Sequence, residues 1–514
     1  MSPAQKNPSE AFLADLVAEG ELVTRSGTRW ARAVVSDKGW TEAISRLAAG
    51  QWAMLGLWGE PELAHLAVAD ESSGGFGILS LNCPDGHYPS VSLHHPPALR
   101  LERAAKDLFG LEARGAPDDR PWLDHGRWGV TFPLGSAAEG WADPRTYQFL
   151  ASEGPGLHQI AVGPVHAGVI EPGHFRFTVQ GETVVRLEER LGYAHKGIEG
   201  LMAGATLANA MELAGRVSGD STVAYSWAFA QAVESALGVE PPARGTWLRA
   251  LMAELERVAN HLGDIGAVCN DAAFALMHAH CGALREEVLR ASAAAFGHRL
   301  MRDRVIPGGV ATDFSSQGKL AVRRLIDHIR RRFPTLVELY DNTASLQDRT
   351  VAAGQLKPEL ARQYGAGGYV GRASSRAFDA RQAPGYAPYD QLRFEVPVLD
   401  EGDVNARVWI RIREVEQSLD LLDQILEDLP RGPVTAKLEP QARVSEGVGL
   451  VEGFRGDILV WLRIEADGTL GRCHLRDPSW FQWPLLEAAI ADNIVADFPL
   501  CNKSFNCSYS GHDL

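Results

Sequence analysis

The sequence Arg216-Val-Ser-Gly-Asp-Ser221, together with the tail Lys503-Ser-Phe-Asn-Cys-Ser-Tyr-Ser-Gly-His-Asp-Leu514, decides how the rest of the chain is interpreted. Both stretches are rich in small polar residues, and each lies beside apolar sequence that is typical of a buried core. They are far apart in the chain. Two distant polar loops of this kind usually converge on one pocket when a protein carries out chemistry. We therefore expect the two stretches to meet at a single site.

Length and composition limit the class of protein. The chain has 514 residues, which is enough for more than one domain at the usual ~100–200 residues per domain. Its formal net charge of -15 argues against nucleic acid as the main partner, because phosphate binding requires clustered Lys and Arg. No apolar run reaches the ~18 residues that span a bilayer, and the N-terminus shows no signal pattern. These features predict a cytoplasmic chain, which is still able to dock on a membrane protein.

No cofactor motif is intact. The cysteines show no Cys-x-x-Cys spacing, whereas an iron–sulfur cluster requires four thiolates at compact spacing; they are Cys83, Cys269, Cys281, Cys473, Cys501 and Cys507. We expect them to be mostly packed free thiols. The segment Gly447-Val-Gly-Leu-Val-Glu-Gly453 is not a nicotinamide-binding turn, because its last glycine is one place late and it continues into a strand pattern.

Hydrophobic periodicity predicts an α+β fold in two parts. Strand-length apolar runs at 52–58 and 76–81, and a helical pattern at 98–109, predict a small α/β docking domain over residues 1–140. Residues 141–155 are expected to form a linker. Residues 156–514 are expected to form a large, mainly helical-bundle domain with peripheral β-hairpins, one of them turning at Gln180-Gly181. Its predicted helices are 195–214, 220–237, 245–269, 272–298, 318–346 and 403–428, and the last 60 residues return to a strand pattern.

Several further motifs follow one another in a specific order. They are Leu101-Glu-Arg-Ala-Ala-Lys-Asp-Leu-Phe-Gly110, Gly192-Tyr-Ala-His-Lys-Gly-Ile-Glu199, Glu254-Leu-Glu-Arg-Val-Ala-Asn-His-Leu262, Glu452-Gly-Phe-Arg-Gly-Asp457 and Arg476-Asp-Pro-Ser479. Together with the two opening stretches, they resemble the large subunit of group 4 membrane-bound, energy-converting nickel-iron hydrogenases and the 49 kDa-type quinone-site subunit of complex I. The block before residue 130 resembles the 30 kDa-type subunit of complex I, fused in front. The resemblance covers about residues 45–514 and implies a hydrogenase large-subunit fold.

In the hydrogenases, each of the two opening motifs carries a Cys-x-x-Cys pair, and the four thiolates hold nickel and iron. The corresponding positions in this chain are Ser218, Ser221, Ser508 and Gly511. A tail read one place earlier offers Cys507 and Ser510 instead, which is still no pair. Nickel requires soft thiolates. The chain is therefore expected to be an energy-converting hydrogenase-related variant that binds no metal or cofactor of its own, with a four-iron cluster in a partner. Because the sequence ends at Leu514, we also expect no nickel-triggered trimming peptide.

The resemblance also indicates residues for proton handling. Glu171 matches the acidic residue that membrane hydrogenases place beside their site for proton exit, and His166 is the first histidine of a glycine-proline loop. Arg455 matches the residue that contacts the iron's diatomic ligands, and without iron we expect it to neutralise Asp513 or Glu171. The full set of pocket candidates is Glu171, His166, Arg455, Arg216, Asp220 and Asp513. The alternative for each of them is a helix cap or a structural ion pair.

The sequence favours one function and leaves alternatives open. We expect a subunit of a complex I-like, hydrogenase-related oxidoreductase that couples electron transfer to proton or ion translocation. By resemblance its partners are an iron–sulfur small subunit and antiporter-like membrane subunits, on the cytoplasmic face of the inner membrane. A quinone-reducing subunit is the first alternative, although Ile170 and Gly219 replace the expected His and Tyr. A scaffold without chemistry is the second, and a zinc or manganese site built from Asp220, His166, His512 and Asp513 is the third.

Overall fold

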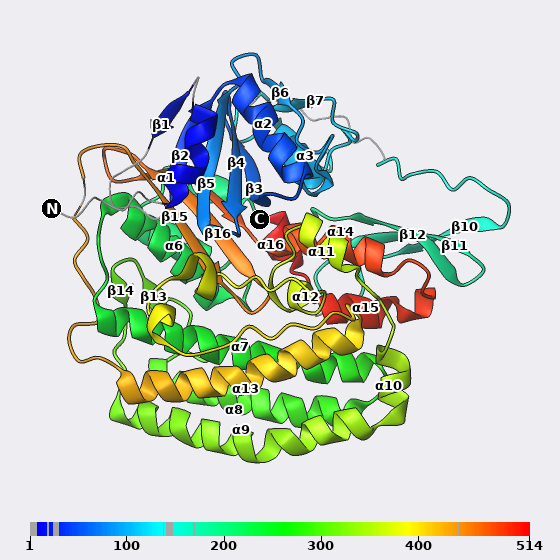
Figure 1. The fold of residues 1–514 in the computed structure, drawn as a ribbon, viewed down its shortest axis with the longest axis vertical. Helices are drawn as coiled ribbons and strands as arrows, with labels where there is room; N and C mark the ends of the chain where they lie inside the picture. The colour runs from blue at the N-terminus through cyan, green and yellow to red at the C-terminus, as the bar shows by residue number, and fades with distance from the viewer. Residues whose placement is uncertain are drawn as a thin grey trace.

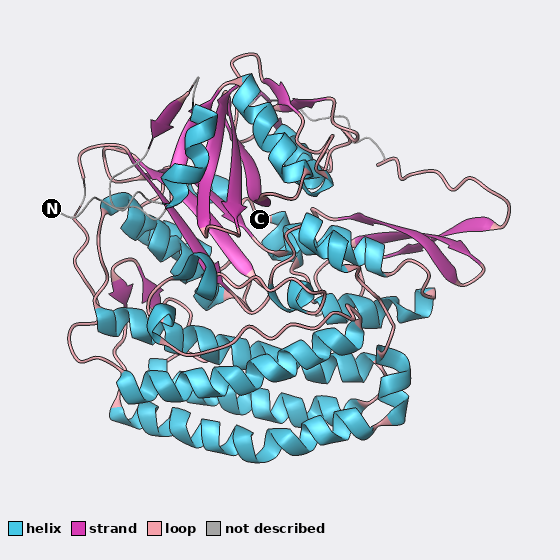
Figure 2. Ribbon diagram, viewed as in Figure 1, coloured by secondary structure: helices cyan, strands magenta, loops and turns pink. Residues whose placement is uncertain are grey.

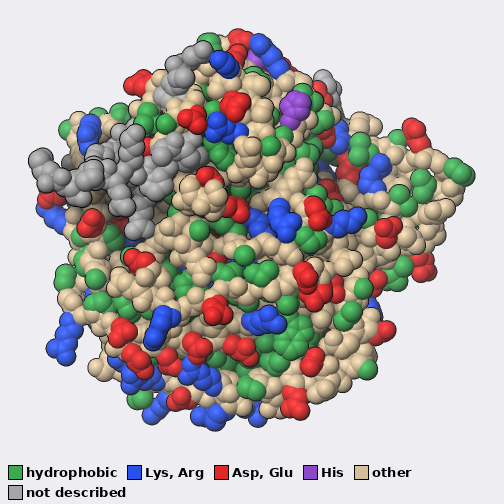
Figure 3. All heavy atoms as spheres, in the orientation of Figure 1, with side chains coloured by type: hydrophobic (Ala, Val, Ile, Leu, Met, Phe, Trp, Pro, Cys, Tyr) green, Lys and Arg blue, Asp and Glu red, His purple; other side chains and the backbone are tan. Residues whose placement is uncertain are grey.

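The computed structural model places a sheet-rich part above a layer of long helices (Figures 1 and 2). It describes residues 8–17, 20–23, 30–136, 138–139, 147–167, 170–439 and 441–514. Both helices and strands are abundant, which confirms the α+β class. None of the helices in these ranges is long and apolar enough to cross a membrane. On the face drawn in Figure 3, acidic and basic side chains are interspersed rather than sorted by sign.

The N-terminal part is built on a five-stranded sheet with the order β1-β2-β5-β4-β3. Its β2 and β5 pair in parallel and its other neighbours are antiparallel. The bounds are β1 (Glu21–Val23), β2 (Ala31–Val35), β3 (Ala53–Glu60), β4 (Leu63–Asp70) and β5 (Gly75–Asn82). The helices of this part are α1 (Pro8–Leu13), α2 (Asp37–Ala48) and α3 (Leu99–Phe109), and its short strands are β6 (His87–Pro89), β7 (Glu112–Arg114), β8 (Val130–Thr131) and β9 (Ala138–Glu139). Because α3 buries Leu101, Ala104 and Ala105 on one face, it covers β3.

A second antiparallel sheet, β10-β11-β12, projects from the body at the right of Figure 1. Its strands are β10 (Leu157–Val162), β11 (His174–Gln180) and β12 (Thr183–Arg190). The predicted hairpin is confirmed, since β11 pairs with β12 across a turn in which Gly181 has a φ of 61°. The 163–173 connection between β10 and β11 carries His166 and Glu171.

Four long helices form the lower layer of Figure 1. They are α7 (Ala243–Asp271), α8 (Ala275–Phe296), α9 (Ser316–Asn342) and α13 (Val404–Asp428), and they agree with four of the predicted helices. Above them, α6 (Thr222–Leu237) is buried on almost every side, as its nearly continuous apolar sequence requires. This helix begins directly after Ser221, so the first polar stretch is fixed to the centre of the fold.

A third sheet joins the two parts of the molecule. It consists of β15 (Ser445–Glu452), β16 (Asp457–Ile464) and β17 (Leu470–Arg476), and it packs on α6. The β15 strand can lie close to α6 because it carries Gly447 and Gly449, where a Cβ would lie 1.9 and 2.0 Å from carbonyl oxygens of α6. On the other side the Trp461 ring lies 5.6 Å from the Trp58 ring of the N-terminal sheet. The two parts therefore share one core.

Two secondary-structure predictions were wrong. The single helix expected at 195–214 is broken into α4 (Ile198–Met202) and α5 (Leu207–Ala214), because Gly204 adopts a φ of 73° between them. The strand pattern predicted for the last 60 residues is confirmed for β16 and β17, but the tail after β17 is helical, with α14 (Ser479–Ala489), α15 (Phe498–Phe505) and α16 (Tyr509–Asp513). The remaining short elements are β13 (Val305–Ile306), β14 (Gly309–Val310), α10 (Ala344–Thr350), α11 (Pro358–Gln363) and α12 (Gly368–Arg372).

The first six residues of the predicted linker, 141–146, lie outside the described residues, so the expected division at 140 and 155 stays a prediction. All six cysteines are buried free thiols, as expected.

Candidate functional site

The two polar stretches meet, as the sequence predicts. The first precedes α6, and the second runs from the end of α15 into α16. Ser508 is the N-cap of α16, and its hydroxyl donates a hydrogen bond of 3.3 Å to the Ser218 hydroxyl. Asn506, with a φ of 46°, turns the chain between the two tail helices so that Ser508 faces the first stretch. Both stretches contribute to the wall of one cavity of about 440 Å³.

The cavity is lined by both polar and apolar side chains. Val162, Ile170, Phe175 and Phe498 form part of its apolar wall. Its acidic, basic and histidine side chains come from the β10–β11 connection, the first stretch, the end of α7, the loop after β15 and α15; they are His166, Glu171, Asp220, Asp271, Arg455 and Lys503. Its volume lies within the ~300–1,000 Å³ of typical ligand pockets.

An ion pair between Arg455 and Asp220 lies at the centre of the polar wall. Arg455 Nη1 donates to Asp220 Oδ1 at 3.0 Å, and a second, shorter bond joins Nη2 to Oδ2. Ser218 donates to the same carboxylate at 2.5 Å. Burial alone would raise the pKa of Asp220, but the Arg455 guanidinium and the Ser218 hydroxyl outweigh it and hold the pKa at about 2. The expectation that Arg455 neutralises Asp513 or Glu171 is therefore wrong, because its carboxylate partner is Asp220.

His166 and Glu171 both line this cavity. The His166 Nε2 lies 2.8 Å from the Gly173 carbonyl oxygen, to which it donates, so the ring is fixed in orientation. Glu171 is exposed to the cavity mouth, and its Oε2 accepts the Ser510 backbone N–H at 3.1 Å. Four of the six candidates, His166, Glu171, Asp220 and Arg455, are thus brought together.

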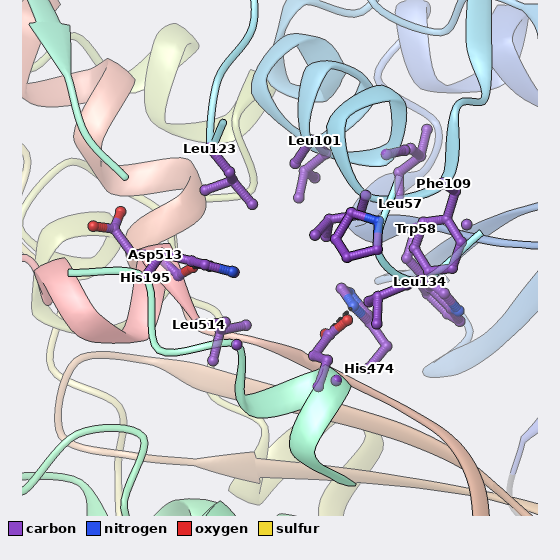
Figure 4. Close-up of a pocket in the computed structure, with 18 of the residues that line it drawn as sticks. Leu57, Trp58, Leu101, Phe109, Leu123, Leu134, His195, His474, Asp513 and Leu514 are labelled. Carbon is purple, nitrogen blue, oxygen red and sulfur yellow. Dashed lines mark hydrogen bonds and ion pairs between the residues drawn. The ribbon is translucent and has the colours of Figure 1, made fainter. Parts of the chain in front are cut away.

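The other two candidates, Arg216 and Asp513, lie elsewhere. Arg216 points outward and makes a forked ion pair with Asp303 at 2.7 and 2.9 Å. Asp513 is fully buried and accepts the backbone N–H groups of Gly192 and Ala194 at 2.9 and 2.8 Å. It borders a separate apolar cavity of about 110 Å³ beneath α3, shown in Figure 4. Each of these residues orders a loop and does not face the polar cavity.

The four positions of the former thiolates do not fit a nickel-iron centre. Ser218, Ser221 and Ser508 present hydroxyls, which are hard and weakly acidic donors compared with the thiolates that nickel requires. At Gly511 a side chain has no room, because a Cβ would lie 2.5 Å from Asp477 Oδ2. The Tyr225 hydroxyl donates to that same oxygen at 2.7 Å and keeps the carboxylate in place.

The alternative zinc or manganese site receives no support from the geometry. His512 packs between aromatic rings, with its ring 4.0 Å from that of Trp480 and its Nε2 accepting from Trp122 Nε1 at 3.2 Å. Asp513 faces the Gly192 loop, whereas His166 and Asp220 face the polar cavity. The four proposed ligands are therefore divided between two places.

Several residues at or behind the site were missed by sequence reasoning. Asp271 and Lys503 line the cavity, and Lys196 donates to the Val217 carbonyl at 2.7 Å, which positions the first stretch. Glu256 is buried behind that stretch and accepts the N–H groups of Val223 and Ala224 at 2.7 and 3.1 Å. Burial raises the pKa of Glu256 to about 8, with the Asp220 charge adding to the effect. The Glu254-Leu-Glu-Arg257 sequence on α7 contains this residue, but the pattern alone does not show that its second glutamate is buried as well as its first.

Comparison with known proteins identifies the families to which the chain is similar. Residues 271–445 match the family described as respiratory-chain NADH dehydrogenase, 49 Kd subunit, and residues 76–140 match the 30 Kd subunit. Formate hydrogenlyase subunit 5 of Escherichia coli is 31% identical over 83% of this chain and 77% of its own length. The C/D protein of the NADH-quinone oxidoreductase of Phocaeicola vulgatus is 28% identical over 80% of this chain and 84% of its own length.

A solved structure of a respiratory membrane complex contains a chain with a similar fold. A chain of the membrane-bound sulfane sulfur reductase, described as an archaeal respiratory membrane complex, matches with a TM-score of 0.66 and 25% identity, over 70% of this chain and 98% of that chain. Fold and relatives together define a subunit of a complex I-like oxidoreductase. The chain belongs to the family of complex I 49 kDa-type and membrane-bound hydrogenase large subunits, with a 30 kDa-type region fused in front.

Proposed function

We propose that this chain couples electron transfer to proton or ion translocation in a membrane-associated complex without a nickel-iron site or other cofactor of its own. The chain docks on the cytoplasmic face of the inner membrane. Its partners are a small subunit with a four-iron cluster and antiporter-like membrane subunits. The family membership supports the oxidoreductase setting, and the similarity to subunits of a formate hydrogenlyase, a quinone oxidoreductase and a respiratory membrane complex supports the partners.

The observation that carries the proposal is the Asp220–Arg455 pair on the wall of a hollow that both former metal motifs line. The pair keeps the hollow polar, since two linked charges facing open volume hold water rather than exclude it. Around it stand His166, Glu171 and Asp271, and histidine and carboxylate side chains are the usual groups for proton transfer. Partial burial raises the pKa of Asp271, which brings this carboxyl nearer to exchange at neutral pH. The site is thus suited to moving protons rather than to holding nickel.

The partners are tested by affinity purification of the tagged chain from detergent-solubilised membranes. We expect a cluster-bearing small subunit and antiporter-like subunits to be recovered with it. Metal analysis of the same sample is expected to show iron but no stoichiometric nickel. Recovery of the chain alone from the soluble fraction would contradict the proposed coupling role.

The proton role is tested in that complex with Glu171→Gln and Arg455→Gln, once its turnover is measured. Both changes are expected to lower turnover and proton coupling. The matched controls are Glu182→Gln, an exposed carboxylate at the turn between β11 and β12, and Arg443→Gln, an exposed guanidinium. If all four variants behave alike, the chain is a scaffold that seals the cavity and takes no part in proton movement.

Quinone binding is the second candidate, because the cavity is large and its apolar side, with Val162, Phe175 and Phe498, suits an apolar ring and tail. Against it, Ile170 and Gly219 stand where the family resemblance expects the groups that protonate a quinone. Extraction of quinone from the purified complex, or inhibition of its turnover by quinone-site inhibitors, favours this candidate. Neither result is expected from the proton role alone.

A further inference from the structure

A second group of buried charges lies behind the C-terminal tail, where α3, β12 and α14 meet. Arg100 of α3 donates through Nη1 to Glu189 Oε2 at 3.1 Å, and its Nη2 lies 2.7 Å from Glu487 Oε1. Glu487 Oε1 also accepts the Glu189 backbone N–H at 2.7 Å. One guanidinium therefore holds two carboxyl groups, each from a different element.

The charges in this group do not balance if both carboxyls are ionised. The Glu189 side chain is 0% exposed and its Oε1 has no hydrogen-bond partner, so a full negative charge there would lack compensation. Burial raises the pKa of Glu189 well above its ordinary value, and the neighbouring Glu487 raises it further. Burial also raises the pKa of Glu487, which Arg100 opposes. Two carboxyls that share one cation release their protons as a pair, one far less readily than the other.

A neighbouring group of charges, in contrast, has equal numbers of carboxylates and guanidiniums. Glu188, the next residue of β12, bonds to Arg120, which also bonds to Asp118. A second cation, Arg103, contacts Asp118 at 3.1 Å, so that neighbouring group has two carboxylates and two guanidiniums. Glu188 and Arg103 also act on Glu487 with opposite sign. The group of Arg100, Glu189 and Glu487 has two carboxyls and only one guanidinium.

This group extends from the surface to the cavity wall. The Glu487 side chain is 24% exposed, whereas that of Glu189 is fully enclosed. Glu189 pairs in register with Phe175, whose side chain lines the polar cavity. The Glu189 charge also acts on Cys507 and Tyr509 of the cavity wall, and burial with this charge raises the pKa of the Tyr509 hydroxyl above its ordinary value.

We propose that Glu189 and Glu487 share one exchangeable proton against Arg100 and form the inner supply of protons to the cavity. The inference rests on the proposed function and names a route for it. Glu487 takes a proton from solvent as Glu189 gives one up to water in the polar cavity, so the acceptor is cavity water. The pair holds one proton before and after the step, and no electron moves. Both glutamates act by positioning this proton and do not touch the reacting atoms.

The shared proton is tested by infrared difference spectroscopy of the purified full chain, with whatever subunits accompany it, between neutral and alkaline pH. The wild type is expected to show a protonated-carboxyl band from the pair. Glu189→Gln and Glu487→Gln are each expected to lose this same band, because the remaining carboxylate then has Arg100 to itself and ionises. Glu188→Gln, the matched control, keeps the band. The separate band of Glu256 is expected to remain in all three variants.

Two results overturn the sharing of the proton. A band that survives both substitutions shows that the pair is doubly ionised and only structural. Loss of a different band in each variant shows two independent protons. Both results can be obtained even if the chain is purified alone. A failure of this inference can therefore be distinguished from a failure of the proposed function.

The route to the cavity is tested in the assembled complex by the pH profile of turnover. Glu189→Gln is expected to shift or flatten the profile relative to Glu188→Gln. Identical profiles in the two variants overturn the supply role, whatever the infrared result. Rescue of the wild-type profile by Glu189→Asp, which restores a carboxyl, is the expected outcome of the conservative change.

Discussion

Two regions of this molecule bury many charges, and they differ in what those charges face. The first, here called the ion network, lies between the long helices and β15; it consists of Glu254, Arg257, Arg372, Asp379, Arg381, Glu414 and Glu452. Each of its carboxylates contacts an arginine, and all seven residues are buried. The second is the polar cavity, where Asp220 and Arg455 are paired but Glu171 and Asp271 face open volume. Burial of charge therefore does not mark a site by itself.

Breaking the ion network is expected to have the largest effect. Arg372 contacts Glu414 at 2.8 Å, Glu452 at 2.9 Å and Asp379 at 3.3 Å, and it is 0% exposed. Arg372→Met leaves these carboxylates short of a cation, and removing one partner from a buried set costs about 3–5 kcal/mol. Denaturant melts are expected to show this loss. The exposed helix pair Arg290–Glu286 is the control, and Arg290→Ala is expected to change stability by less than about 1 kcal/mol.

Restoring the lost thiols sharpens the comparison at the cavity. Ser218→Cys and Ser508→Cys replace one small side chain with another, so we expect both to fold normally. Gly511→Cys is expected to cost about 1–3 kcal/mol, because its Cβ would lie 2.5 Å from Asp477 Oδ2. Thermal melts measure the difference. Combining it with Asp477→Ala is expected to recover part of the loss, and no recovery would show that the strain has another source.

Glu256, behind the cavity, predicts a pH dependence of stability. Its pKa of about 8 exceeds the ordinary value, so the folded chain holds a proton that the unfolded chain has lost over most of the range. The contribution of Glu256 to stability is therefore fully present below the ordinary carboxyl pKa and falls as pH rises toward 8, by about 1.4 kcal/mol per pH unit. Glu256→Gln is expected to remove that slope. Equal slopes in denaturant melts of the two proteins would contradict a protonated Glu256.

The smallest effect is expected at Arg216. Its pair with Asp303 is on the surface, and the two side chains are 36% and 38% exposed. Exposed pairs of this kind contribute about 0–1 kcal/mol. Arg216→Ala is expected to leave both stability and turnover of the complex nearly unchanged, whereas Arg455→Gln lowers turnover. If Arg216→Ala lowered turnover as much as Arg455→Gln does, Arg216 would have to be counted as a functional residue.

Much of the architecture was predictable because it depends on local periodicity. The apolar repeats indicated α6, α7, α8, α9 and α13, and the Gly181 turn indicated the β11–β12 hairpin. The interruption at Gly204 was missed because a lone glycine in an apolar pattern does not show which φ it will adopt. The helical tail after β17 was missed for a related reason, since short apolar segments fit either period until their packing is known.

The cavity was predictable only in part. The convergence of the two polar stretches followed from their composition, and four of the six candidates are brought together there. The partner of Arg455 was not predictable, because Asp220, Glu171 and Asp513 are all acidic and only the fold decides which one it reaches. The filling of the Gly511 position by Asp477 depends on Tyr225, a contact across 252 residues of sequence that no local pattern reveals.

The tail that lines the cavity has a consequence for timing. His512 receives a hydrogen bond from Trp122 of the N-terminal part and stacks on Trp480, so α16 is held by early and late parts of the sequence together. A ribosome releases α16 after all the other elements that build the hollow. The part of the cavity wall that Ser508 and Tyr509 supply is therefore the last to be added, and a nascent chain that still lacks them has an incomplete cavity.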